Sequence, residues 1–295
     1  MYSVNRIDDF DNVLNNQNKS FVSVAICGGI GNQLFQIASV LDYSSRTNKI
    51  PVFLNVLDLP NAHNYERKTQ WNTLFSNKLN VIDKERFSKI IFRRYHEKKE
   101  VTYNMIPLMN GNIYLTGYYQ AHQYISDNTK EIMKSLIYSN DSYMKTAHDM
   151  YDKIKHHFND MSDDNFVSIH VRRGDYLKVS EFHTVLDESY YKNAYDKVCE
   201  NGKKHIVVFS DEIDWCKNNF KITDNIYYVD INDCCIELIL MSLFKHNIIA
   251  NSTFSWWATF ISNYQNKIVV APKNWFGPSG YKEYKDLYLP NWHIM

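Results

Sequence analysis

The sequence has few of the residues that break up a compact chain. Its 295 residues include only 9 glycines and 6 prolines, against 22 tyrosines and 16 phenylalanines. Disordered or linker-dominated chains have the opposite balance, so the composition indicates a folded globular protein. The length suffices for one large domain or for two of about 150 residues each.

The sequence also lacks net charge and long apolar runs. Its 33 lysines and arginines balance 33 aspartates and glutamates, which excludes the broad attraction of a general nucleic-acid or membrane-surface binder. No apolar run approaches the roughly 20 residues that cross a bilayer. The segment MYSVNRIDDFDNVLNN is acidic and amide-rich where a signal peptide is apolar. We expect no nucleic-acid partner, no membrane span and a cytoplasmic location.

Residues with the spacing of a metal site are missing as well. The cysteines are odd in number and lack the paired spacing of a zinc site, so free thiols are the simplest account of them. Asp9 and Asp11 spell a DxD pair, but they precede the first predicted strand, so we regard the match as chance. We expect no bound metal. The cysteines are Cys27, Cys199, Cys216, Cys234 and Cys235.

What is present is an alternation of short apolar runs with helical patterns. In the first half a helix is predicted over 32–45, residues 60–110 are mixed, and residues 119–158 are mostly helical. The predicted strands of this half are 21–27, 50–55 and 112–117. The second half is more regular, with predicted strands at 165–171, 205–210, 225–230, 247–250 and 267–271, and predicted helices at 189–200, 235–244 and 253–262.

Strands that alternate with helices of this length predict an α/β protein whose parallel sheets are covered on both faces. We expect one such sheet in each half, with a first domain over residues 1–155 and a second over 156–295. Ligands of these folds bind outside the carboxyl ends of the strands. The motifs described below all fall at such ends.

Three of the few glycines, Gly28, Gly29 and Gly31, follow the first predicted strand within four positions. Glycine permits positive φ and close approach of the backbone, and the helix that follows presents free N–H groups to an anion or polar ligand. A tight strand-to-helix turn without a ligand is the alternative.

A dinucleotide fingerprint is disfavoured at this loop. Its third glycine would fall at Leu34, and the second strand ends at the neutral Asn55, where a ribose-binding acid would be required. Gly31, Asn32 and Gln33 therefore look like a loop that faces a substrate.

The segment HVRRGDY (170–176) places His170, Arg172, Arg173 and Asp175 at the end of a predicted strand. Arginine binds phosphate oxygens in two-point contacts and stays charged. Neighbouring residues of an extended segment point in opposite directions, so we assign Arg172 to phosphate, and Arg173 to structural or donor support through an ion pair with Asp175. A surface Arg-Asp pair is the alternative, and His170 is either a ligand contact or a satisfied strand-end histidine.

The segment IIANSTFSWW (248–257) begins as a buried strand and becomes a helix whose start carries Ser252, Thr253 and Ser255. Hydroxyls there cap a helix, and together with free N–H groups they also form an anion site. We assign these residues, with Asn251, to donor binding. The following tryptophans, at 256 and 257, are expected in the core.

Three acidic or basic groups remain as candidates. Asp211 ends a predicted strand, where its carboxylate either accepts hydrogen bonds from guanine or ribose or caps the next helix. Glu181 and His183 follow the arginine motif at a distance from which either could deprotonate an acceptor.

Taken together, these blocks resemble the bacterial-type α-1,2-fucosyltransferases of glycosyltransferase family 11. The resemblance extends over about residues 22 to 276, with Thr259 standing where the family usually has a small residue. The blocks are CGGIGNQLFQIA (27–38), GYYQ (117–120), HVRRGDY (170–176), FHTVLDESYY (182–191), FSDE (209–212), HNIIANSTFSWWATF (246–260) and APKNWF (271–276).

The resemblance implies a GT-B architecture of two Rossmann-like domains that face a cleft. It also implies inverting transfer of L-fucose, without metal or cofactor, from GDP-fucose to the 2-hydroxyl of a terminal galactose in a glycan. By the same analogy Arg172 holds the β-phosphate with the help of Ser252 and Thr253, Asp211 lies near guanine, and the loop Gly31–Gln33 closes the cleft from the first domain.

Two alternatives stay open at this point. One is a glycosyltransferase with another donor, such as GDP-mannose or a UDP-sugar. The other is a non-catalytic carbohydrate-binding protein, which leaves the paired arginines and the glycine loop unexplained.

Overall fold

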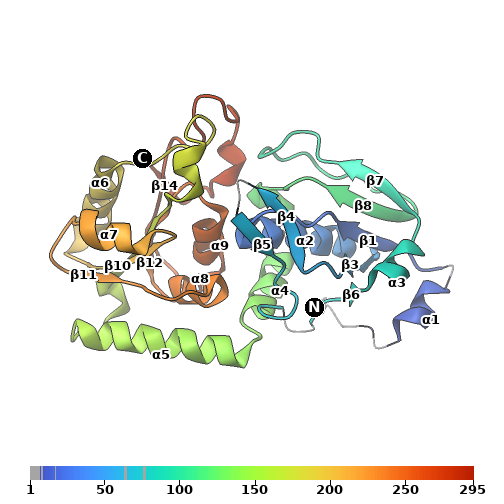
Figure 1. The fold of residues 1–295 in the computed structure, drawn as a ribbon, viewed down its shortest axis with the longest axis horizontal. Helices are drawn as coiled ribbons and strands as arrows, with labels where there is room; N and C mark the ends of the chain where they lie inside the picture. Colours follow the sequence, from blue (N-terminus) through green and yellow to red (C-terminus); the bar gives the residue numbers. More distant parts are fainter. Residues whose placement is uncertain (1–6, 8, 17, 63–64, 76–77) are drawn as a thin grey trace. The chain divides into compact units, whose positions relative to one another are not determined.

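The structure, a computed structural model, describes residues 7, 9–16, 18–62, 65–75 and 78–295 (Figure 1). Two compact units make up the chain. The first comprises residues 1–140 and 283–287, and the second comprises residues 141–282 and 288–295. The boundary expected between residues 155 and 156 falls inside helix α5 (Asp141–His157).

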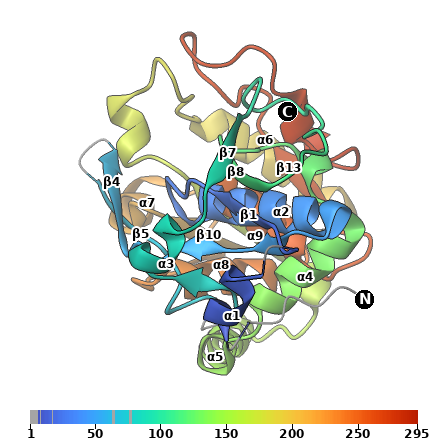
Figure 2. The same ribbon diagram turned by 90° about the vertical axis from the view of Figure 1, so that its right-hand side faces the viewer.

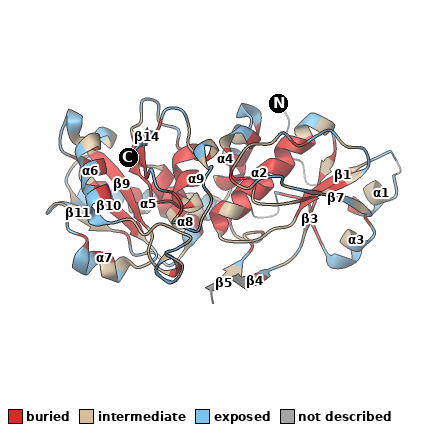
Figure 3. Ribbon diagram, turned by 90° about the horizontal axis from the view of Figure 1, so that it is seen from above, coloured by how far each residue is buried: buried red, intermediate tan, exposed pale blue. Residues whose placement is uncertain are grey.

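Four parallel strands form the main sheet of the first unit. Their order is β2 (Ile50–Pro51), β1 (Phe21–Val24), β8 (Asn112–Thr116) and β7 (Phe92–His96). Helix α2 (Ile30–Thr47) packs against β1, and most of it is coloured as buried in Figure 3. Each buried Leu, Ile or Phe of this layer contributes roughly 1.5 to 3 kcal/mol. The strand, turn and helix predicted from residue 21 onward are confirmed.

The region predicted as mixed contains several short elements. Strands β4 (Asp58–Ala62) and β5 (Tyr65–Lys68) form an antiparallel hairpin at the side of the first unit (Figure 2). Strand β6 (Val81–Ile82) pairs with β3 (Phe53–Leu54), and β7 joins the main sheet as an edge strand. The sequence of β7, FRRYH, has no apolar alternation because much of this edge is exposed, so propensity alone did not reveal it. The other elements of this unit are α1 (Phe10–Leu14), α3 (Lys84–Ser88), η1 (His122–Tyr124) and α4 (Asp127–Ile137).

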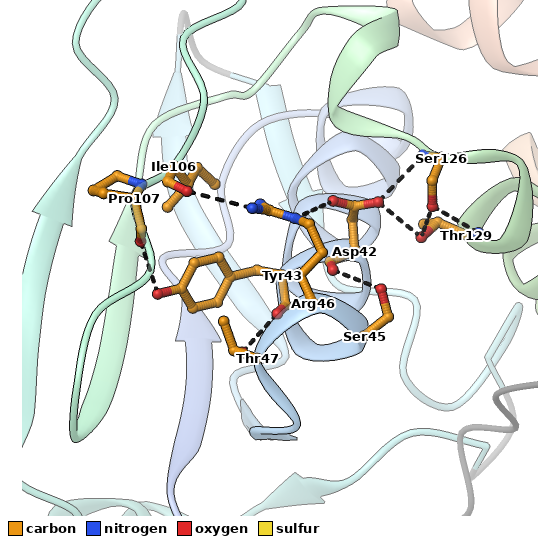
Figure 4. Close-up of polar contacts among 9 residues, drawn as sticks. All are labelled: Asp42, Tyr43, Ser45, Arg46, Thr47, Ile106, Pro107, Ser126 and Thr129. Carbon is orange, nitrogen blue, oxygen red and sulfur yellow. Dashed lines mark hydrogen bonds and ion pairs between the residues drawn. The ribbon is translucent and has the colours of Figure 1, made fainter.

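A polar network fixes helix α2 within the first unit (Figure 4). One carboxylate oxygen of Asp42 accepts from the backbone N–H of Ser126 and from the hydroxyl of Thr129, each at 3.2 Å. Its other oxygen accepts from Nε of Arg46 at 3.0 Å, and this guanidinium also reaches the carbonyl of Ile106. The network ties the second half of α2 to the start of α4, so the glycine loop at the other end of α2 starts from a fixed helix.

Six parallel strands form the sheet of the second unit. Their order is β11 (Ile226–Tyr228), β10 (His205–Ser210), β9 (Phe166–Val171), β12 (His246–Ile248), β13 (Val269–Ala271) and β14 (His293–Ile294). Numbered in chain order, the strands lie in the sequence 3-2-1-4-5-6, which is the order of a doubly wound sheet. The strands stay parallel, but the order in which they are added to the sheet reverses between β9 and β12. Ligands of such sheets bind at the carboxyl ends of those two strands.

The predicted helices of the second unit are confirmed as α6 (Glu188–Val198), α8 (Cys234–Ser242) and α9 (Thr253–Ile261). Trp256 and Trp257 of α9 have no exposed surface, so they belong to the core as expected. Strand β14 was not predicted, because its two residues lie exposed at the sheet edge. The remaining elements are α7 (Ile213–Asn219), η2 (Asp163–Asn165), η3 (Asp175–Lys178), η4 (Cys199–Asn201) and, in the first unit, η5 (Lys285–Leu287).

Candidate functional site

The guanidinium of Arg172, directly after β9, lies between two carboxylates. Its Nη2 is 2.5 Å from Asp175 Oδ1, and its Nη1 is 2.9 Å from Asp211 Oδ2. The ring of Tyr176 lies under it, 5.2 Å from ring centroid to guanidinium carbon. Burial lowers the pKa of Arg172, but the neighbouring carboxylates outweigh burial and the net pKa is raised. The result is a permanent cation held in one orientation at the carboxyl edge of the sheet.

Asp211, at the end of β10, holds the strand-end segment of β9 in place. Besides its ion pair with Arg172, it accepts the backbone N–H of Arg173 at 3.0 Å. Burial raises the pKa of Asp211, and the charge of Arg172 opposes that rise. The N-cap of α7 is Glu212, so Asp211 does not cap that helix as one alternative held. Its predicted contact with guanine stays a prediction.

The ion pairs of the two arginines differ from the sequence-based hypothesis. Asp175 pairs with Arg172 and not with Arg173, because the extended strand ends at Val171 and the chain turns at Gly174 before η3 begins at Asp175. Arg173 instead lies over the ring of Trp215, 3.5 Å from its centroid, and pairs with Glu212 at 3.3 Å. The expected ion pair of Arg173 with Asp175 is therefore wrong, and Arg173 is held by stacking on α7.

The start of α9 forms the second side of the site. Ser252 is its N-cap and accepts the backbone N–H of Phe254 at 3.4 Å, so the nine-residue helix begins at the turn that follows β12. Ser255 lies one turn further, fully buried, and its hydroxyl is 3.0 Å from Nδ1 of His170. Burial lowers the pKa of His170 to about 3, so its ring is neutral. His170 thus has the partner expected of a satisfied strand-end histidine.

Tyr176 connects Arg172 with the start of α9. Its ring supports the guanidinium, and its hydroxyl donates to the carbonyl of Asn251 at 2.9 Å. Because β9 and β12 are neighbours, Arg172 and the turn from Asn251 to Thr253 lie at the same edge of one unit. The structure therefore brings together the two groups that the sequence assigned to one anion.

The side chain of Asn251 is 1% exposed and ties two loops together. Its amide donates to the carbonyl of Thr184 at 2.9 Å and to that of Trp275 at 2.8 Å. This places the amide inside the unit, where it positions the loops. The sequence could show that Asn251 ends a strand but not which way its side chain points.

The two candidate bases have different surroundings. His183 stacks on Tyr176 at 4.2 Å between ring centroids, with nearly parallel planes, and on Phe276 at 5.8 Å. Glu181 is exposed, and its carbonyl accepts the hydroxyl of Ser279 at 2.7 Å. The structure thus places His183 one ring away from Arg172. Which of the two takes a proton stays a prediction.

Glu237 also lies in this region, and the sequence did not identify it as a candidate site residue. It lies in the first turn of α8, where burial raises its pKa to about 8 and the nearby Cys234, Asp233 and Asp211 add to the rise. A carboxyl group with so raised a pKa near a strand end is typical of functional sites. The available signal was its position as the single charged residue in the apolar helix CCIELILMS.

The glycine loop belongs to the first unit, at the carboxyl end of β1. Gly28 has φ of +76°, and a Cβ there would lie 2.5 Å from the amide nitrogen of Asn32. At Gly29, the N-cap of α2, a Cβ would lie 3.0 Å from Nη1 of Arg67. Gly28 is therefore required by its positive φ, whereas a Cβ at Gly29 would displace only the end of the Arg67 side chain. Arg67 comes from hairpin β4–β5, so nothing in the sequence around the loop predicts a cation beside it.

The amides of the loop have partners in the first unit. The side chain of Gln33 is 1% exposed and donates to the carbonyls of Gly28 at 3.1 Å and Lys68 at 2.9 Å. Asn32 accepts from the amide of Gln120 at 2.9 Å. Gly31 is buried in the first turn of α2. Gln33 therefore closes the loop from inside, and Asn32 links it to the turn after β8.

A second buried carboxyl supports that turn. Glu97 follows β7 and accepts the backbone N–H groups of Tyr118 at 2.8 Å and Tyr119 at 3.0 Å. Burial raises the pKa of Glu97 to about 7, although these two hydrogen bonds lower it. The turn contains Gly117 with φ of +144° and Tyr119 with φ of +55°, so the carboxyl group stabilises a backbone that is costly by itself.

Across the part of the chain that the structure describes, no three His, Cys, Asp or Glu side chains gather in an arrangement suited to a metal ion. Within the same residues, no helix combines the length and the apolar character that crossing a bilayer requires.

The fold is that of a GT-B-like glycosyltransferase. The solved structure of the α-1,6-fucosyltransferase NodZ soaked with GDP-fucose aligns with a TM-score of 0.56, over 82% of this chain and 93% of that chain. The sequences are 12% identical, so this similarity shows the fold alone.

Sequence comparison gives the family. The model of Glycosyl transferase family 11 matches residues 11–295. The O-antigen biosynthesis glycosyltransferase WbnK of Escherichia coli is 30% identical over 287 residues, which cover 85% of this chain and 93% of WbnK. An alpha-1,2-colitosyltransferase of Escherichia coli is 27% identical over 281 residues, covering 87% and 93%. The chain belongs to glycosyl transferase family 11, which confirms the family expected from the sequence blocks.

The raised pKa of Glu237 predicts a pH-dependent effect of Glu237→Gln on stability. The folded protein holds this proton more tightly than the unfolded chain, so the stability from Glu237 is complete below about pH 4.5 and is lost as the pH rises through about 8. Glutamine does not titrate. Relative to the wild type, the variant should gain on the order of 2 to 4 kcal/mol between pH 5 and pH 9.

Thermal unfolding of both proteins at pH 5, 7 and 9 measures this difference. Glu131→Gln, at an exposed glutamate of α4, controls for the loss of a surface charge. A stability difference for Glu237→Gln that stays constant with pH would show that Glu237 is ionised at neutral pH like an ordinary surface glutamate.

Proposed function

We propose that the chain transfers L-fucose from GDP-fucose to the 2-hydroxyl of a terminal galactose in a glycan, with inversion at the sugar carbon. The observation that carries the proposal is the guanidinium of Arg172, fixed by Asp175 and Asp211 beside the start of α9. Membership of glycosyl transferase family 11 and the alpha-1,2 linkage in the name of one relative support the reaction class.

Arg172 has donors left for a phosphate. A guanidinium carries five N–H groups, and the two ion pairs engage one terminal nitrogen each. The remaining N–H groups are held in a fixed plane, which suits two-point contact with phosphate oxygens. The carboxylates therefore orient the cation without using all of its donors.

The start of α9 supplies the second half of a diphosphate site. The first N–H groups of a helix carry partial positive charge and bind anions. Ser252 and Thr253 add hydroxyls at the same place. Since Tyr176 joins this turn to Arg172, both groups can reach one pyrophosphate.

The proposed reaction requires positive charge beside the diphosphate of the donor. When the bond between the sugar and the pyrophosphate breaks, positive charge develops on the ring and negative charge on the departing GDP. A donor already aimed at the phosphate stabilises that charge, and one such donor contributes roughly 3 to 4 kcal/mol. Arg172 and the helix start supply this charge, so the proposed reaction uses no metal or cofactor.

The acceptor side completes the proposal. The galactose 2-hydroxyl attacks the sugar carbon from the face opposite the leaving group, and its proton passes to Glu181 or His183. The second unit holds the donor and both candidate bases, and the glycine loop of the first unit, from Gly31 to Gln33, contributes to substrate binding.

Similarity to one relative supports a second candidate for the sugar donor. The alpha-1,2-colitosyltransferase of Escherichia coli matches this chain over 87% of its length, so nucleotide-activated colitose is the alternative donor to GDP-fucose. The acceptor chemistry is the same in both cases.

Arg172→Ala should lower turnover by two to three orders of magnitude, as expected from loss of about 3 to 4 kcal/mol of transition-state stabilisation. Arg172→Lys should fail in the same way, because lysine keeps the charge but loses the planar two-point contact. Initial rates of GDP release, with circular dichroism to confirm folding, measure both variants.

Arg86→Ala is a matched control for the loss of a paired arginine. Arg86 also lies between two aspartates, with contacts of 2.9 Å to Asp11 and 2.7 Å to Asp83, but on the surface of the first unit. It should leave the rate unchanged. Near-normal turnover of folded Arg172→Ala would remove Arg172 from the mechanism.

A donor-by-acceptor screen tests the reaction itself. GDP-fucose, GDP-mannose, UDP-galactose and nucleotide-activated colitose are each offered with galactosides, and NMR determines the linkage of any product. We expect a fucose or colitose joined α-1,2 to galactose, and a higher melting temperature with GDP than with UDP. Stabilisation by UDP alone, or transfer to another hydroxyl, would contradict the proposed donor or linkage.

A further inference from the structure

The second unit contains a cavity of about 460 Å³ that none of the roles above explains. One wall is the segment from Thr184 to Asp187 with the first turns of α6, and the other is the segment from Pro272 to Asn274. The latter directly follows β13, so the cavity opens at the same carboxyl edge as the donor site. Its volume falls in the range of roughly 300 to 1,000 Å³ that is usual for ligand pockets.

Buried hydrogen bonds fix the positions of the two walls. The amide of Asn251 donates to the carbonyl of Thr184 in one wall and to that of Trp275, next to the other. The hydroxyl of Tyr190, on α6, is 2.7 Å from the carbonyl of Ile249 and 3.3 Å from that of Val270. The cavity is therefore part of the folded unit and does not have to be opened by a ligand.

The lining favours a neutral ligand rich in hydroxyls. Asp187 is engaged as the cap of α6, accepting from the N–H of Tyr190 at 3.0 Å and the hydroxyl of Ser189 at 2.6 Å. The exposed amides of Asn193 and Asn274 each offer a donor pair and an acceptor. Amides of this kind match neighbouring hydroxyls of a sugar, whereas an anion site would need more cations than Lys273, the one that lines this cavity.

The cavity is close in sequence and space to the proposed transfer centre. Its wall residue Thr184 follows His183, which stacks on Tyr176 beneath Arg172. A ligand whose end reaches His183 can therefore extend along the chain into the cavity. An acceptor longer than one sugar has this property.

We propose that the cavity is a subsite for the acceptor glycan and binds the neutral sugar next to the galactose that is modified. The inference rests on the proposed function for the identity of the galactose. The amides of Asn193 and Asn274 bind hydroxyls of that second sugar, and the fixed walls set the direction in which the glycan leaves the site.

The test compares a disaccharide acceptor with a monosaccharide. In the double variant Asn193→Ala/Asn274→Ala the KM for lactose should rise about tenfold, as expected from the loss of two hydrogen bonds to neutral groups. The KM for methyl β-galactoside, the KM for GDP-fucose and the saturated rate should stay within a factor of two of the wild type. Asn193→Trp, which fills the cavity, should have a larger effect on lactose alone.

Asn218→Ala/Asn263→Ala is the matched control, since both asparagines are exposed in the same unit and away from the cavity. An unchanged KM for lactose in the first double variant, or an equal rise for lactose and methyl β-galactoside, would overturn the subsite.

Saturation-transfer NMR with lactose, without donor, separates this inference from the proposed function. Transfer to the glucose protons of lactose in the wild type, and its loss in Asn193→Trp, would support the subsite even if no fucose were transferred. Transfer of fucose with no such signal, or with a signal that survives in the variant, would leave the proposed function standing and overturn the subsite.

Discussion

The contact on which the site depends is the double ion pair that holds Arg172 between Asp175 and Asp211. The three groups come from the end of β9, the turn after it and the end of β10, so the contact joins two strands at their carboxyl edge. Removing either carboxylate would leave a partly buried arginine short of a partner, which is costly. The orientation of the cation is thus built into the packing of the sheet.

The remaining parts of the donor side attach to this contact through Tyr176, which links Arg172 to the start of α9 and to His183. Arg173 stacks on Trp215 and does not share the contacts of Arg172, so the two adjacent arginines are not interchangeable. The order of the strands places β9 and β12 side by side, which makes the arginine motif and the serine-rich helix start neighbours although 80 residues separate Arg172 from Ser252.

The sequence predicted most of the second unit because most of its strands are short, largely apolar runs that alternate with helical patterns. It failed where burial does not mark the element, as in the charged edge strand β7. It also could not give side-chain direction. Gln33, His170 and Asn251 stand at strand or helix ends, yet all three point inward. The partner of Asp175 was assigned wrongly because the chain is not extended after Arg172: it turns at Gly174 and enters η3 at Asp175. The position of Arg67 beside the glycine loop became apparent only in the structure, whereas Glu237 stands out in the sequence as the single charged residue of an apolar helix.

A crystal structure of the protein with GDP would show whether Arg172 and the start of α9 bind one diphosphate. Oxygens of the diphosphate should lie about 3 Å from the terminal nitrogens of Arg172 and from backbone N–H groups at the start of α9, with Asp175 and Asp211 still paired to the guanidinium. GDP bound with its phosphates on Arg173 alone, or away from the carboxyl ends of β9 and β12, would contradict this arrangement.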